Sequence, residues 1–169
     1  MMKLTKKDMK IVKKGKEYFK SIRFVNREIK YLKEEYKELS YIKSVNFSEL
    51  PSECNTPKDK QMNSLIIRQD TILSKINVYS KIVDEFITLT FFLETKPRRV
   101  IQTYINSIGY TDMINKLDEK YQYSENTYNR LIPRICLELS KYIDYSNMIS
   151  IDNLNKDISI GTETVLKNQ

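Results

Sequence analysis

The sequence predicts an all-α protein: a long antiparallel helical hairpin, coiled-coil-like in its repeat, followed by a C-terminal helix-turn-helix module. Three observations predict this class. Apolar residues recur every three or four positions through most of the chain, only three residues are glycine, and the helix formers Lys, Glu and Leu dominate the first quarter. With 169 residues, the chain has room for one domain or for a hairpin plus one small module.

The first helix is expected from Thr5 to about Val45. Gly15 is its weak interior point, and we expect a soft joint there. A linker rich in Ser, Asn and Pro is expected at about residues 44–61. The apolar a and d positions of the first helix form a coiled-coil seam, which we call the first seam: Ile11, Tyr18, Ile22, Val25, Ile29, Leu32, Tyr36 and Leu39.

A second long helix is expected to complete a hairpin over residues 1–94. Its mostly apolar positions recur about every 3.5 residues and form the second seam: Met62, Leu65, Gln69, Ile72, Ile76, Tyr79, Val83, Phe86, Thr90 and Leu93. Two amphipathic helices joined by a loop most simply pack antiparallel in one chain. The alternative is a homodimer through one seam, and the polar Gln69 and Thr90 fit either arrangement.

Three shorter helices are expected in a module over residues 95–145. The first runs from about 96 to 107 after Thr95 as N-cap, and Gly109 ends it. Thr111 caps the second, and a turn at Gln122 leads to a third that begins after Ser124. The expected inward residues are Val100, Ile101, Tyr104, Ile105 and Ile108, then Ile114, Leu117 and Tyr121, then Tyr128, Leu131, Ile132, Ile135, Leu139, Tyr142 and Ile143. The polar segment 146–169 is expected to be a weakly ordered tail.

Several residue types are absent or scarce, and this excludes much chemistry. Without histidine, the chain has no His-based triad or His-ligated metal. Three glycines leave no phosphate-cradling loop, so we expect no catalysis, no cofactor and no metal. Cys54 and Cys136 imply no disulfide framework in a chain of this size, and no apolar run approaches roughly 18 residues. We therefore expect a reduced cytoplasmic protein with no membrane segment.

The positive charge is concentrated at the N-terminus. Residues 1–43 hold 14 Lys or Arg against 6 Asp or Glu, whereas the rest of the chain holds 15 against 16. The net charge of +7 is therefore a property of the first helix. Its lysines spread around a helical wheel, which fits either a solvated face or an arm that contacts phosphates.

The third short helix begins with residues that suit contacts to DNA base edges in the major groove. Glu125, Asn126, Asn129 and Arg130 supply the donors and acceptors that such contacts require. Ser124 and Thr127 at the helix start suit a phosphate. The flanking cations expected to clamp the backbone are Lys116, Lys120, Arg134 and Lys141. We therefore expect double-stranded DNA as a partner.

The same segment resembles a known family. Ile114, Leu117 and Tyr121, then Tyr123-Ser124 and Thr127-Tyr128, with Leu137 and Leu139 downstream, look like the terminal helix-turn-helix of small phage proteins. These proteins are similar to region four of bacterial sigma factors and include the ArpU-type and RinA-type transcriptional activators. The resemblance extends in architecture over about residues 23–143. It implies transcription control, with RNA polymerase or a second copy of the chain as a further partner.

Three residues depart from that family pattern. Asp118 stands where a small residue usually packs between the two helices, and Gln122 stands where glycine is common in the turn. Pro133 is expected to divide the third helix into a short segment 125–131 and a further helix.

A different class of function remains open beside DNA binding. Residues 111–143 carry five basic and five acidic side chains, so this stretch is neutral and lacks a basic patch. The alternative is a helical interaction protein of a mobile element that binds, inhibits or adapts a host protein. An enzyme with a tyrosine nucleophile is not expected, because the chain lacks the Arg and His set that such recombinases need.

Overall fold

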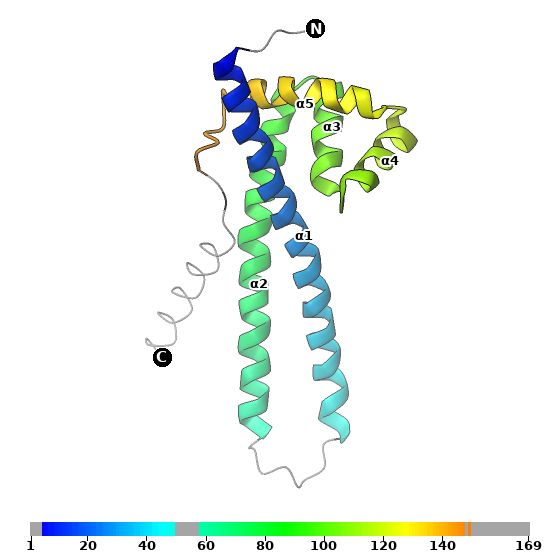
Figure 1. Cartoon of the computed structure of the whole chain (residues 1–169). Helices are drawn as coiled ribbons and strands as arrows, with labels where there is room; N and C mark the ends of the chain where they lie inside the picture. Colours follow the sequence, from blue (N-terminus) through cyan, green and yellow to red (C-terminus); the bar gives the residue numbers. More distant parts are fainter. Residues whose placement is uncertain (1–4, 50–57, 148, 150–169) are drawn as a thin grey trace. The chain divides into compact units, whose positions relative to one another are not determined.

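The computed structural model describes residues 5–49, 58–147 and 149, with the side chains of 5–41, 63–147 and 149. Every regular element in these ranges is helical, which confirms the all-α class for the described residues (Figure 1). The elements are α1 (Lys6–Glu49), α2 (Lys58–Leu89), the 3-10 turn η1 (Thr90–Phe92), α3 (Thr95–Asn106), α4 (Tyr110–Tyr121) and α5 (Glu125–Leu139).

Helix α1 begins at a reciprocal cap. The backbone amide of Thr5 donates to Asp8 Oδ2 at 2.9 Å, and the amide of Asp8 donates back to Thr5 Oγ1 at 3.2 Å. The helix then continues without a break through Gly15, where a soft joint was expected. Residues 44–49 and 58–61, expected in the linker, are helical as well, and the remaining linker residues 50–57 lie outside the described residues.

The chain divides into two compact units. Unit 1 comprises residues 1–27 and 81–151, and unit 2 comprises residues 28–80 and 152–169. This division differs from the expected one at residue 94, because the start of α1 and the end of α2 belong with the three short helices. The expected tail lies outside the described residues from 150 onward and at 148.

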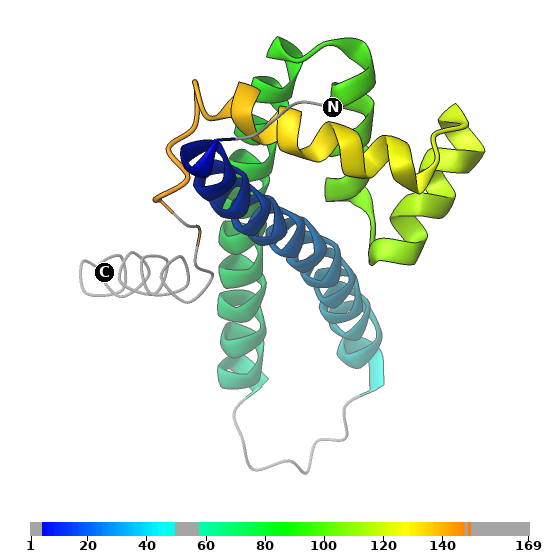
Figure 2. The same cartoon turned by 45° about the horizontal axis from the view of Figure 1, so that its top comes forward.

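Unit 2 contains the α1 and α2 segments that carry the middle of both seams. The segments lie side by side (Figures 1 and 2). Gln69 Nε2 donates to Ser40 Oγ at 3.3 Å, and Arg68 pairs with Glu35 at 2.6 Å. The apolar seam residues buried here are Ile29, Leu32, Leu39, Ile72, Ile76 and Tyr79, with Gln69 beside them. These heptad positions therefore face inward within one chain, whereas Tyr36 and Leu65 of the same seams are half-buried.

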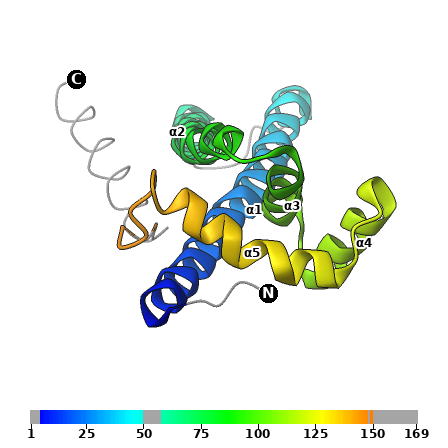
Figure 3. The same ribbon diagram turned by 90° about the horizontal axis from the view of Figure 1, so that it is seen from above.

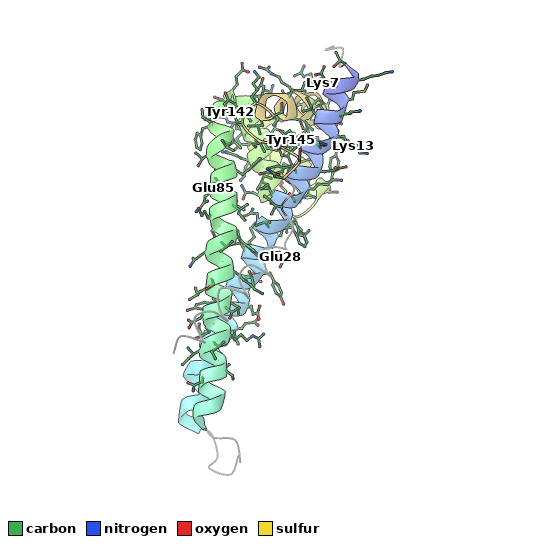
Figure 4. All side chains as sticks on the ribbon, turned by 90° about the vertical axis from the view of Figure 1, so that its left-hand side faces the viewer. Lys7, Lys13, Glu28, Glu85, Tyr142 and Tyr145 are labelled. Atoms are coloured by element: carbon green, nitrogen blue, oxygen red, sulfur yellow. The ribbon has the colours of Figure 1, made fainter. Side chains whose placement is uncertain are left out.

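Unit 1 is built around the crossing of α5 over the start of α1 (Figure 3). Gly15 allows this crossing, because a Cβ atom placed there would lie 2.9 Å from Cys136 Sγ and 3.1 Å from the Tyr145 ring. Tyr145 lies beside α1 (Figure 4), packs edge-on to Phe19 and donates through its hydroxyl to the Cys136 carbonyl at 2.9 Å. Burial raises the pKa of the Cys136 thiol to about 12.

The three short helices share one apolar core. Helix α3 packs on both α4 and α5, and Asn26 of α1 donates to the Ile105 carbonyl at 3.1 Å. The core side chains from these helices are Val100, Ile101, Tyr104, Ile105, Met113, Leu117, Leu131, Ile132, Ile135, Cys136 and Leu139. The helical period predicted most of this set.

Several expectations for these helices are wrong. The N-cap residues of α3 and α4 are Glu94 and Gly109, not Thr95 and Thr111, which lie within the first turns of these helices. Ile108 and Tyr142 are exposed rather than inward, and both lie beyond the last residue of their helices, where the helical period no longer fixes the direction of a side chain. Met113 is fully buried although it was not expected. Pro133 does not divide α5, which runs unbroken from Glu125 to Leu139.

Candidate nucleic-acid interface

The first two turns of α5 present an exposed polar face. Ser124 is the N-cap residue, and its carbonyl accepts from the amides of Thr127 and Tyr128. Four of the expected base-contacting residues are exposed: Glu125, Asn126, Asn129 and Arg130. The opposite face of the same helix buries Leu131, Ile132 and Ile135, so core packing directs the polar face outward.

Glu125 is held in place by a neighbouring helix. The Tyr110 hydroxyl, at the start of α4, donates to Glu125 Oε1 at 2.8 Å. This hydrogen bond is the main cause that raises the pKa of Tyr110. Asn126 and Arg130 make no such contact with any described residue. The α5 face therefore offers one restrained acceptor together with an amide and a guanidinium that are free to bind a ligand.

The expected phosphate-binding residues at the helix start differ in exposure. Ser124 is exposed and Thr127 is half-buried, and their hydroxyl oxygens lie 3.4 Å apart. Ser124 does not cap the helix through a side-chain hydrogen bond to its backbone. Both hydroxyls therefore retain hydrogen-bonding capacity.

Two of the expected clamp cations already form ion pairs with carboxylates. Lys116 Nζ pairs with Asp112 at 2.7 Å. Arg134 pairs with Glu138 at 2.7 Å and with Glu94 at 3.2 Å, and the hydrogen bond to Glu138 is the main cause that raises the pKa of Arg134. Lys120 and Arg130, in contrast, are exposed and form no ion pair with any described carboxylate.

A group of cations that sequence analysis missed lies at the start of α3. Lys96 Nζ lies 4.8 Å from the centre of the Tyr123 ring, and the Arg99 guanidinium carbon lies 4.9 Å from that of Tyr121. Lys96 and Arg99 are exposed. The sequence run Lys96-Pro97-Arg98-Arg99 is the signal that could predict this group, because it places three cations around a helix start.

The turn between α4 and α5 is short and sharply bent. Gln122 adopts the left-handed conformation, with φ 55° and ψ 40°, and its amide donates to the Asp118 carbonyl at 2.8 Å. The amide of Tyr123 donates to the Leu117 carbonyl at 3.1 Å. The Asp118 side chain is exposed and therefore does not lie between the two helices.

Neither a metal site nor a membrane-spanning helix is found among the described residues. No group of three or more His, Cys, Asp or Glu side chains is placed to hold a metal ion. No helix in the described ranges is long and apolar enough to cross a membrane. Comparison of the chain with family models, with curated proteins and with solved structures finds no match.

Proposed function

We propose that the protein is a DNA-binding transcriptional regulator of a phage or mobile element, in which α4, the turn at Gln122 and α5 act as a helix-turn-helix. On this proposal α5 enters the major groove, and α1 and α2 form the coiled-coil-like hairpin that supports it. The proposed likeness to region four of sigma factors adds RNA polymerase as a candidate second partner.

The observation that carries the proposal is the exposed N-terminal face of α5. Asn126 and Arg130 are one helical turn apart, exposed, and without partners among the described residues. Asn suits a bidentate contact to adenine and Arg suits one to guanine. The apolar side of α5 is fixed in the core, so this polar face has a set direction. A helix that distinguishes bases requires both polar groups that are free to make contacts and a fixed direction for those groups.

The test is binding to pooled double-stranded fragments of the source genome across a salt series. We expect a fragment that the protein retains at physiological salt. Asn126→Ala and Arg130→Ala should each reduce affinity for it by about fivefold or more, because one bidentate contact contributes about 1 to 3 kcal/mol.

Matched controls exist on exposed positions outside the short helices. Asn77→Ala and Arg27→Ala remove the same chemical groups from α2 and α1, and both should bind as the parent does. Far-UV circular dichroism checks that helicity is unchanged in all four variants. If Asn126→Ala and Arg130→Ala retain parental affinity, α5 does not make the proposed base contacts.

A protein-interaction module is the second candidate function, and an exposed aromatic group favours it. Phe91 and Phe92 are each 63% exposed, and Phe92 stacks on Tyr142 with ring centres 4.5 Å apart. Exposed aromatic side chains are common at protein interfaces. If the parent retains no DNA fragment, crosslinking to host proteins should depend on this aromatic group. A Phe92→Ser variant that crosslinks like the parent would exclude the aromatic group as the site of protein interaction.

A further inference from the structure

We propose that Lys96 and Arg99, at the start of α3, hold the DNA backbone next to the N-terminus of α5, in place of Lys116 and Arg134. This inference rests on the proposed function, because it assigns the phosphate contacts of the same interface.

Lys116 and Arg134 differ from Lys96 and Arg99 in the groups that surround their charges. A carboxylate partner cancels the charge that a phosphate would attract, and Lys116 and Arg134 each have such a partner. No described carboxylate pairs with Lys96 or Arg99. These two cations instead face tyrosine rings, and an aromatic ring attracts a cation without cancelling its unit charge.

Contact with the tyrosine rings also limits the freedom of the two cations. Free Lys and Arg side chains lose substantial rotamer freedom when they bind, which weakens surface contacts. The rings of Tyr123 and Tyr121 hold the ends of Lys96 and Arg99 against the protein. Both tyrosines are half-buried, and their ring centres lie 5.4 Å apart, so they form one platform. The two cations are therefore ordered before any ligand arrives.

Tyr121 and Tyr123 also determine where the two cations lie. Tyr121 is the last residue of α4, and Tyr123 directly precedes Ser124, the N-cap residue of α5. The two cations therefore gather at the turn that leads into α5. The N-terminus of a helix in the major groove lies close to backbone phosphates, which position the protein along the duplex. The exposed Lys120, adjacent to Tyr121, adds a third cation to the same turn.

The experiment measures how affinity for duplex DNA depends on salt. We compare the parent, the double variant Lys96→Gln/Arg99→Gln and the control double variant Lys116→Gln/Arg134→Gln, which loses the same charge. Probes are the retained genomic fragment and a mixed-sequence duplex of equal length. Affinity falls as salt rises, and each lost phosphate contact reduces the magnitude of the slope of log affinity against log salt by about 0.9. The slope of the first double variant should therefore be shallower than that of the parent by about 1.8.

The controls separate this inference from loss of fold and from loss of the proposed function. Lys96→Arg/Arg99→Lys, which keeps both charges, should restore most of the slope, and the Lys116/Arg134 variant should keep it. The preference for the retained fragment should stay unchanged in the Lys96/Arg99 variant, since phosphate contacts carry no base information.

The overturning results are distinct. Equal slope losses in the two Gln variants would show only the effect of net charge and would overturn the assignment. An unchanged slope in Lys96→Gln/Arg99→Gln, with the parent binding normally, would overturn it and leave the proposed function standing. A parent that binds neither probe would overturn both.

Discussion

Gly15 is the residue at which packing leaves no room for a side chain. A Cβ atom there would meet Cys136 Sγ at 2.9 Å, Cys136 Cβ at 3.0 Å and the Tyr145 ring at 3.1 Å. The Cys136 Cβ is fixed to the α5 backbone, so relief requires a shift of the helix itself. The absent side chain is therefore what sets the close approach of α1 and α5.

We predict that Gly15→Ala lowers the free energy of unfolding by about 1 kcal/mol. Overpacking a filled core costs about 1 to 3 kcal/mol, and the gain in helix propensity from Gly to Ala returns up to about 1 kcal/mol. Urea unfolding followed by circular dichroism measures the difference.

Gly109 provides the matched control for this substitution. Nothing lies within 4 Å of a Cβ atom placed there, and its φ of −148° is extended backbone that any residue adopts. Gly109→Ala should therefore change stability by less than about 0.5 kcal/mol. A Gly15→Ala variant as stable as the parent would mean that the crossing of the two helices adjusts without cost.

At the scale of elements, the turn after α4 holds a glutamine in a backbone conformation that glycine adopts more easily. Gln122 has a φ of 55°, a conformation that costs a residue with a side chain about 1 kcal/mol relative to glycine. We predict that Gln122→Gly raises the thermal midpoint. Gln122→Val should lower it, since a branched side chain tolerates this conformation least. Equal midpoints for the two variants would contradict the assigned turn conformation.

The sequence predicted the inward faces of the helices better than their ends or their charge partners. Seam residues such as Ile76 and Phe86 are buried as the heptad spacing indicated, because helical periodicity follows from the backbone alone. The spacing could not show where a helix stops, and so Ile108 and Tyr142 were placed inward.

The charge partners were missed for a different physical reason. The ion pair between Arg134 and Glu94 joins residues far apart in sequence, and only the packing of α3 on α5 brings them together. The packing of α3 on α4 likewise places Lys96 and Arg99 over Tyr123 and Tyr121, at the end of α4 and in the turn that follows it. Local pattern thus identified the polar face of α5, whereas the balance of charges around it depends on tertiary contacts.

At the scale of the whole molecule, stability should be insensitive to pH near neutrality and fall in alkali. The chain has no histidine, so no side chain with an ordinary pKa near 6.5 titrates there. Burial raises the pKa of Cys136 to about 12 and raises the pKa of Tyr128 and Tyr145. The unfolded chain releases these protons first, so it binds fewer protons than the folded chain in alkali.

We predict a constant free energy of unfolding between about pH 6 and about pH 8 and a decline that starts near about pH 9, where an unfolded thiol ionises. The decline continues towards the folded pKa of about 12. Urea unfolding at stepped pH in a Cys54→Ala background measures it. Adding Cys136→Ala should flatten the part of the curve below about pH 10, before tyrosines ionise. A curve unaffected by that substitution would assign the decline to other groups.

The burial of Cys136 at the crossing of α1 and α5 allows openings of the core to be measured. The Cys136 thiol is fully buried and stays protonated at neutral pH, so a thiol reagent cannot attack it while the core is closed. Labelling of Cys136 then proceeds only during the moments when α5 lifts away from Gly15. In a Cys54→Ala background the labelling rate measures how often these openings occur. A change in this rate when DNA is added shows whether the bound ligand makes openings beneath the α5 face rarer.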